Sequence, residues 1–152
     1  MIRFIFEKGK PTEGKLVYRE KEYSFDTEPR SGIGIGSLLV NDLQLEMDRK
    51  GQILYVWGLC PHTAWKPGNI KTPAAESGIL RVKEVVSPYG ASKKVNNEGH
   101  WQVSANRESG WVCVGNSNAN GQNILFAPGA IAVLIDGSLN ALWLHPDALP
   151  SR

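Results

Sequence analysis

The chain has 152 residues, a length that fits one domain and leaves little room for two. Its 17 basic and 15 acidic residues nearly cancel, and this balance argues against a nucleic-acid-binding or membrane-binding surface. No stretch approaches the roughly 18 apolar residues of a transmembrane span, and the apolar run at the N-terminus is too short for a secretory signal. We therefore expect a cytoplasmic protein in which Cys60 and Cys113 are free thiols.

Charge is distributed unevenly along the chain. The first thirty residues carry thirteen charges of both signs, whereas only Asp136, Asp147 and Arg152 follow Glu108. The N-terminal third is therefore predicted to be a solvated surface, and the C-terminal third to be core or a buried interface.

Alternation of apolar and polar residues predicts strands from the N-terminus onward. Residues 3–6, 15–19 and 22–25 are expected to form a charged meander. Gly32-Ile-Gly-Ile-Gly36 follows, but a dinucleotide fingerprint needs G-x-G-x-x-G between a strand and a helix. Here the third glycine comes one residue too soon and a strand follows. The motif therefore favours a bulged entry to a strand that begins near Leu38.

A hairpin is the strongest structural prediction. Residues 43–47 alternate strictly, residues 48–51 form a polar turn that ends in glycine, and residues 53–57 are apolar again. Met47 should therefore lie opposite Ile53. A helical interpretation of the first strand would place an Asn-Asp pair in the middle of the helix without a cap.

Further strands are predicted over residues 79–86, 100–104, 111–114, 124–127, 130–135 and 139–144. Hairpin turns are expected at residues 105–110 and at Asp136-Gly-Ser138. Residues 130–135 are apolar on both faces, which is typical of a central strand. About ten short strands with little helix predict a mainly β domain over residues 1–152, built as an antiparallel sheet, a sandwich or a partly open barrel.

Two stretches have no strand pattern. The first, residues 60–77, contains three prolines and is called here the excursion. The second, residues 115–123, contains four asparagines and is called the Asn-rich loop. Both are expected on the surface, because irregular backbone is difficult to bury.

Cys60-Pro-His62 is a candidate for metal binding or for a nucleophile and its base. The other His and Cys residues, His100, Cys113 and His145, are scattered along the sequence. The spacing therefore favours a buried structural cysteine at the sheet edge, and we predict no catalytic residue, no metal and no cofactor.

Five tryptophans are many for this length. Trp57 and Trp143 lie in the most apolar strands and are predicted to be core. Trp65 lies in the excursion, where it would either plug the end of the sheet or contact a partner, since Trp is a favoured interface anchor. The plug is the preferred interpretation.

Three stretches carry a resemblance: residues 45–65, 126–137 and 142–146. They resemble small bacterial proteins encoded beside polymorphic or contact-dependent toxins, the immunity-type proteins. The resemblance implies a non-enzymatic cytoplasmic domain that binds one toxin and blocks it. Immunity proteins to basic nuclease toxins tend to be acidic, and this chain is slightly basic. Either the implied toxin is not a basic nuclease, or the resemblance does not extend to function.

Three functions are consistent with the sequence. The first is an immunity-type binding protein whose partner is a cognate toxin. The second is a small enzyme or ligand-binding β domain with its site near Cys60, His62 and Trp65. The third is a structural or assembly subunit. For the first, the residues predicted to bind the partner are His62, Trp65, Lys66, Asn116, Asn118 and Asn120.

Overall fold

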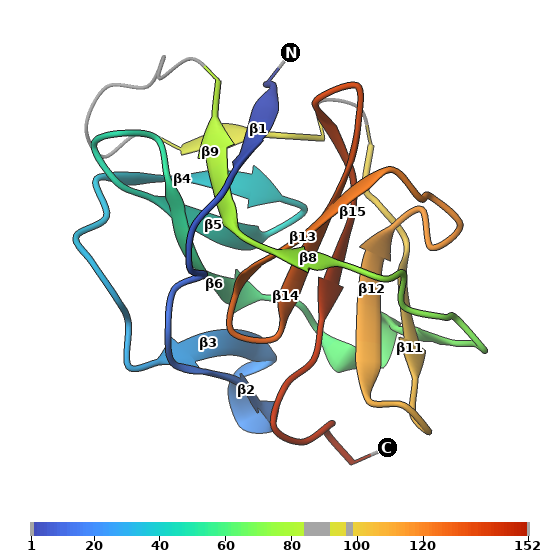
Figure 1. Ribbon diagram of the computed structural model, residues 1–152. Helices are drawn as coiled ribbons and strands as arrows, with labels where there is room; N and C mark the ends of the chain where they lie inside the picture. Colours follow the sequence, from blue (N-terminus) through green and yellow to red (C-terminus); the bar gives the residue numbers. More distant parts are fainter. Residues whose placement is uncertain (1, 84–91, 97–98, 152) are drawn as a thin grey trace.

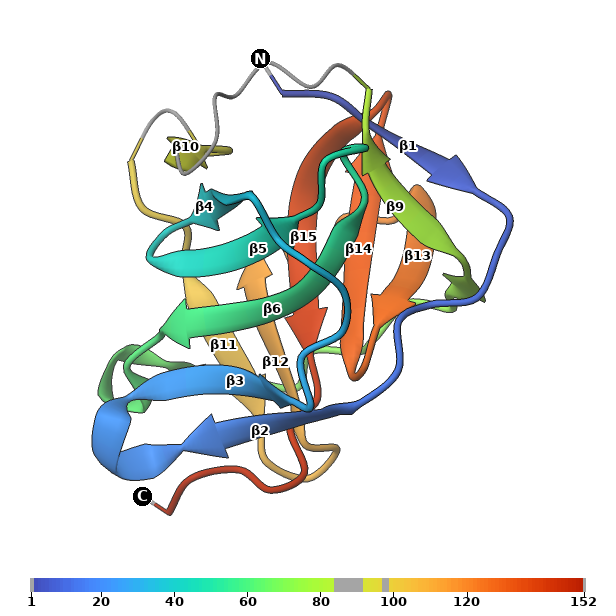
Figure 2. The ribbon, with the colours of Figure 1, turned by 90° about the vertical axis from the view of Figure 1, so that its left-hand side faces the viewer.

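The computed structural model describes residues 2–83, 92–96 and 99–151. It is a β sandwich of two large mixed sheets, with a small third sheet along one side (Figure 1). Strands of the two large sheets cross at a steep angle, as Figure 2 shows. The predicted mainly β fold is confirmed, and the sandwich is the form that it takes.

The first large sheet has six strands. In spatial order they are β10 (Ser92–Lys94), β4 (Gly36–Val40), β5 (Leu43–Met47), β6 (Ile53–Leu59), β3 (Ser24–Glu28) and β2 (Lys15–Arg19). The second large sheet has seven. They are β7 (Lys66–Pro67), β11 (Val103–Asn106), β12 (Trp111–Gly115), β15 (Ser138–Leu144), β14 (Ala130–Ile135), β13 (Gln122–Ala127) and β8 (Glu76–Ser77).

The third sheet pairs β1 (Phe4–Glu7) with β9 (Ile79–Val82). Two 3-10 turns, η1 (Glu20–Glu22) and η2 (His62–Ala64), complete the regular structure of the described residues. The described part of the chain thus has fifteen strands rather than about ten. The excess comes mainly from two-residue and three-residue edge strands, which are too short to produce a period.

The predicted hairpin is confirmed, with Met47 paired to Ile53 across the turn. The helical interpretation of the first strand is wrong, because Asn41 adopts a left-handed conformation (φ 54°) in the turn between β4 and β5. The Gly32–Gly36 motif leads directly into β4 and no helix follows it. The second predicted turn is also present: Asp136 and Gly137 both have positive φ and connect β14 to β15.

The N-terminal meander is wrong. β2 pairs with β3, but β1 leaves them and pairs with β9, nearly eighty residues further along the chain. Residues 20–22 form η1 and Tyr23 adopts a positive φ, so the third predicted strand begins only at Ser24. A short alternating segment does not specify its partner strand. Phe4 pairs with Val82 of β9, and both side chains are buried in the core. The predicted strand over residues 79–86 ends at Val82, and its part beyond residue 83 lies outside the described residues.

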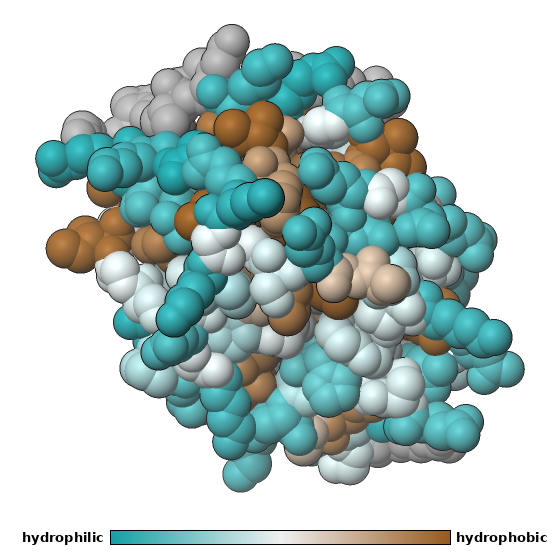
Figure 3. All heavy atoms as spheres, viewed as in Figure 1, coloured by the Kyte–Doolittle hydropathy of each residue, from teal (hydrophilic) through white to brown (hydrophobic). Residues whose placement is uncertain are grey.

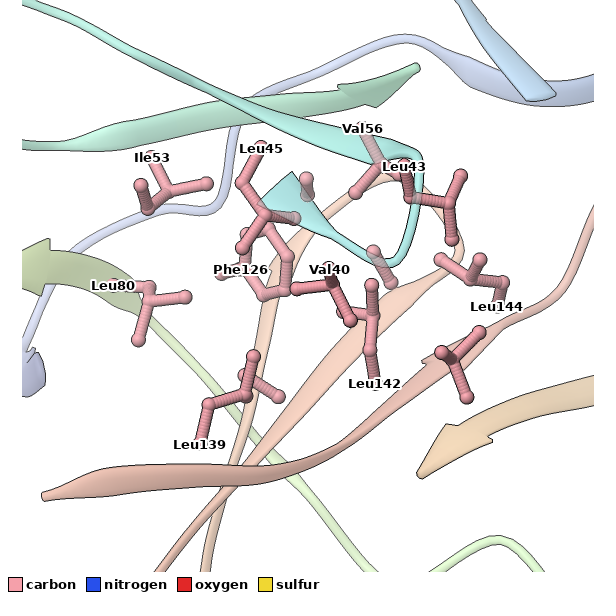
Figure 4. Packing of buried hydrophobic residues seen from close by; sticks show 14 of the residues in the cluster. Val40, Leu43, Leu45, Ile53, Val56, Leu80, Phe126, Leu139, Leu142 and Leu144 are labelled. Carbon is pink, nitrogen blue, oxygen red and sulfur yellow. The ribbon is translucent and has the colours of Figure 1, made fainter. Parts of the chain in front are cut away.

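The inner core lies between the two large sheets, and Figure 4 shows its centre. It takes the inward side chains of β4, β5 and β6 from one sheet and of β12 to β15 from the other. Leu43, Leu45 and Val56 meet Phe126 and Leu142 there (Figure 4). The predicted C-terminal core is confirmed, because β14 and β15 lie in the middle of their sheet and are buried along almost their whole length.

The seven-stranded sheet also buries its outer face. A second cluster of apolar side chains alternates with the first along the same strands, and it comprises Cys113, Ala119, Ile131, Val133, Ala141 and Trp143, with Ile70, Trp111 and Leu125 packed against it. Ile70 belongs to the excursion. The excursion therefore lies across this face as a cover, and the predicted burial of Trp143 is confirmed.

The outer face of the six-stranded sheet is polar by contrast. Trp57 lies on this face, so its predicted place in the core is wrong. Its indole N–H donates to the Glu46 carboxylate at 3.0 Å, and the Arg30 guanidinium lies 4.9 Å from its ring centre. Residue 57 faces outward because it lies opposite Gln44 in the β5–β6 ladder, on the polar side of the alternation.

Candidate partner-binding surface

The excursion is more regular than its sequence suggests. It begins with η2, pairs with β11 through β7 at one edge of the seven-stranded sheet, and pairs with β13 through β8 at the other edge. Between these two strands it crosses the outer face of the sheet. The expectation of a stretch without strands is wrong on this point, because each end is held by one parallel two-residue ladder that no sequence pattern marks.

Asparagine side chains fix the excursion to the sheet. The Asn106 amide donates to the Ile70 carbonyl at 3.1 Å, and the Asn123 amide donates to the Ala74 carbonyl at 2.9 Å. Ile70 adds an apolar anchor against the outer cluster. The backbone of the excursion is therefore held at several points before any partner arrives.

The Asn-rich loop is ordered by its own side chains. The Asn116 side chain accepts the backbone N–H of Asn118 at 3.0 Å, and the Asn123 amide donates to the Asn120 side chain at 2.7 Å. Ala119 is buried in the outer cluster, which pins the loop to the sheet. The side chains of Asn116, Asn118 and Asn120 are exposed.

The excursion and the Asn-rich loop face each other across a hollow of about 570 Å³, lined by residues 69–73 on one side and residues 117–120 on the other. A second hollow, of about 360 Å³, shares Asn69 with the first. A third, of about 250 Å³, shares Pro67, Ala105 and Arg107 with the second. We call these three adjoining hollows the furrow and the third one the His62 pocket. Both irregular segments lie at the right of Figure 1, and Figure 3 shows polar surface broken by small apolar groups over the same view.

A cluster of rings forms the wall behind the His62 pocket. The His62 ring stacks on Tyr23 at 5.4 Å, and Trp65 packs against Tyr18 at 5.0 Å and Phe25 at 5.9 Å. The Trp65 indole nitrogen is buried and has no hydrogen-bond partner in the described part of the chain. Trp65 therefore plugs the end of the sandwich, as preferred from the sequence, and its other side lines the pocket.

Tyr18 holds His62 in place. Its hydroxyl donates to the Cys60 carbonyl at 2.8 Å and accepts the backbone N–H of His62 at 3.0 Å. Since the hydroxyl has one proton and gives it to Cys60, the contact of 3.3 Å with Nδ1 makes the His62 ring the donor. Burial raises the pKa of Tyr18 to about 12, so the hydroxyl keeps its proton at neutral pH.

The buried Cys60 thiol does not have the chemistry of a nucleophile. Burial raises its pKa to about 11, and the negative charge of Asp42 adds to the rise. The reactive form of cysteine is the thiolate, which is scarce at neutral pH under these conditions. The His62 ring turns Nδ1 toward the Tyr18 hydroxyl.

The structure places four of the six predicted residues in the furrow, in two groups, and the other two next to it. His62 and Trp65 line the pocket at one end, with Lys66 exposed beside them on β7. Asn118 and Asn120 line the far hollow, and Asn116 lies at the base of the same loop. Sequence reasoning missed Arg107, Ile70 and Lys71. Arg107 sits in the predicted 105–110 turn, and its place in the pocket depends on how β11 lies beside β7.

Comparisons with protein-family models, with curated proteins and with solved structures found no match. Among residues 2–83, 92–96 and 99–151, no group of three or more His, Cys, Asp or Glu side chains could hold a metal ion. The same described residues contain no helix that is long and apolar enough to cross a membrane.

Proposed function

We propose that this chain is a non-enzymatic, cytoplasmic binding protein of immunity type, which neutralises a cognate protein toxin through the furrow. The observation that carries the proposal is the juxtaposition of the two irregular segments on one side of a rigid sheet. Their backbones are fixed by side-chain hydrogen bonds, so a partner would order little on binding. Side chains that a partner could contact line both ends of the furrow: His62 and Trp65 at one end, Asn118 and Asn120 at the other.

Charge defines the kind of partner. Lys66 is exposed beside the furrow, and Lys71 and Arg107 line it, whereas Glu108 is the one acidic residue that lines the three hollows. A surface of this sign steers and orients an acidic patch on the partner. A toxin that is not a basic nuclease would fit this surface.

Calorimetric titration with the product of the neighbouring gene tests the proposal. Lys71→Glu should weaken binding roughly tenfold or more, since it places a like charge against an acidic partner. The matched control is Lys50→Glu, an exposed lysine in the turn between β5 and β6, which should bind as the wild type does. Lys71 is a better probe than Trp65, because Trp65 also supports the end of the sandwich.

Co-expression of the chain with that neighbour should restore growth if the neighbour is a toxin. A wild-type chain that binds none of its neighbours' products would count against the immunity function. Equal binding by both lysine variants would show that the partner does not contact the furrow. The chain could then still be an immunity protein that binds through another surface.

A further inference from the structure

The His62 pocket has the composition of a site for one small anionic group. Trp65, Pro67 and Ala105 give it apolar walls, and Arg107 gives it a guanidinium. One nitrogen of Arg107 donates to the Pro150 carbonyl at 2.7 Å. No other hydrogen bond of Arg107 occurs in the described part of the chain, so its remaining N–H groups are available to a ligand while this bond restrains the guanidinium.

A planar fork of N–H groups held in place is the donor that carboxylates prefer, because two parallel hydrogen bonds can form at once. Half-buried Trp65 and buried Ala105 make one flank of the guanidinium apolar, and a less polar flank strengthens such bonds. The volume of about 250 Å³ accommodates a side chain or a small aromatic acid, and not a large cofactor.

The carboxylate of Glu20 limits how much negative charge a ligand of the pocket can carry. Its carboxylate accepts the Ser151 hydroxyl at 2.9 Å, which holds it on the C-terminal segment, and it interacts electrostatically with both His62 and Arg107. Because Glu20 offsets part of the Arg107 charge, a single carboxylate suits the pocket better than a phosphate dianion does.

We propose that the His62 pocket binds a carboxylate, supplied by an acidic side chain of the protein partner, with Arg107 as its hydrogen-bonding anchor. The identity of the bearer rests on the proposed function. The carboxylate chemistry of the pocket does not, because it follows from Arg107, its apolar surroundings and Glu20.

Three isosteric probes test the chemistry on the full chain: benzoate, neutral benzamide and cationic benzamidinium. Titrations are followed by NMR at the indole N–H of Trp65 and the side-chain N–H groups of Arg107. Benzoate should bind at least roughly tenfold more tightly than benzamide, as expected for a charge-assisted hydrogen bond. Benzamidinium should bind most weakly.

Arg107→Gln should bring benzoate down to the affinity of benzamide, and Arg107→Lys should retain part of the difference. Arg49→Gln, at an exposed arginine of the β5–β6 turn, is the matched control and should leave all three affinities unchanged. Melting curves of the variants show that each is folded.

Tighter binding of benzamide than of benzoate would mean that the pocket prefers carboxamides. Tighter binding of benzamidinium would mean that it prefers cations, attracted by the Glu20 carboxylate and the aromatic rings. Either result overturns the proposal, as does a failure of all three probes to bind. The two hypotheses separate cleanly. If benzoate fails while Lys71→Glu still weakens the partner complex, the proposed function stands without this pocket. If benzoate binds while no neighbouring product does, the pocket stands without the proposed function.

Discussion

The outer faces of the two large sheets differ in polarity and in burial. The six-stranded sheet exposes a polar face, on which Arg30 lies over Trp57 and pairs with Asp26. The seven-stranded sheet buries an apolar face, on which Trp143 is fully covered and Ile70 of the excursion forms part of the cover. The difference follows the sequence of the strands, because residues 43–47 alternate whereas residues 130–135 are apolar on both sides.

A strand that is apolar on both faces needs one covering layer on each side of its sheet. In this molecule the second layer is the excursion, a segment whose own sequence has no regular pattern. The candidate site is therefore also a structural element. Substitutions that weaken binding have to be distinguished from those that detach the excursion from the sheet.

Thiol labelling should give the largest contrast. Burial raises the pKa of Cys113 to about 12 and that of Cys60 to about 11. At pH 8 both native thiols should therefore react on the order of a hundredfold or more slowly than in the unfolded chain, and Cys113, beneath the cover, should be the slower. Labelling followed by mass measurement distinguishes the two sites. A disulfide between them in freshly purified protein would contradict both the free, buried thiols and the proposed cytoplasmic location.

Removal of the buried tryptophan should cost the most stability. Trp143→Ala should lower the free energy of unfolding by about 3–5 kcal/mol, since it empties a large fully buried volume. Trp57→Ala, on the polar face, should cost roughly 1 kcal/mol. Trp65→Ala, at the plug, should fall between them. Urea unfolding midpoints measure all three. Equal losses of unfolding free energy in Trp143→Ala and Trp57→Ala would contradict the difference in burial between the two faces.

Ile70 tests the cover itself. Ile70→Ala should cost about 1 kcal/mol, because its half-buried side chain loses contact with the outer cluster. Ile70→Asp should in addition accelerate labelling of Cys113 while leaving Cys60 unchanged. The control is Ile33→Ala: Ile33 is 84% exposed, and the change should stay within about 0.5 kcal/mol. Unchanged Cys113 labelling in Ile70→Asp would mean that other residues hold the cover.

The polar face should give a smaller effect that depends on pH. Burial alone would raise the pKa of Asp26, but the backbone N–H of Thr27 and the guanidinium of Arg30 outweigh it and hold the pKa below its usual value. A carboxyl with a lowered pKa stabilises the fold above its unfolded-state pKa, and this contribution is lost as the pH falls through the folded-state value. The wild type should therefore lose more melting temperature than Asp26→Asn between pH 6 and pH 3. Parallel curves would exclude this carboxyl as a source of acid sensitivity.

Local patterns predicted the elements that local physics controls. The hairpin at residues 48–51 and the turn at Asp136 follow from period two and from residues that tolerate positive φ. The central strand over residues 130–135 follows from its continuous apolar run. The two irregular segments were also recognisable as the longest stretches without a period. That these two segments lie close together could not be predicted, because no local pattern in either segment depends on the other.

The sequence by itself determined that this is a mainly β protein with a C-terminal core, since alternation and apolar runs act within a few residues of one another. Tertiary structure decided the rest: that β1 pairs with β9, that Trp57 faces outward, that the excursion covers a sheet, and that Arg107 joins His62 and Trp65. These outcomes depend on contacts between residues far apart in the chain. Packing two sheets and a cover around the inner core and the outer cluster selects them, because this arrangement buries both faces of the seven-stranded sheet at once.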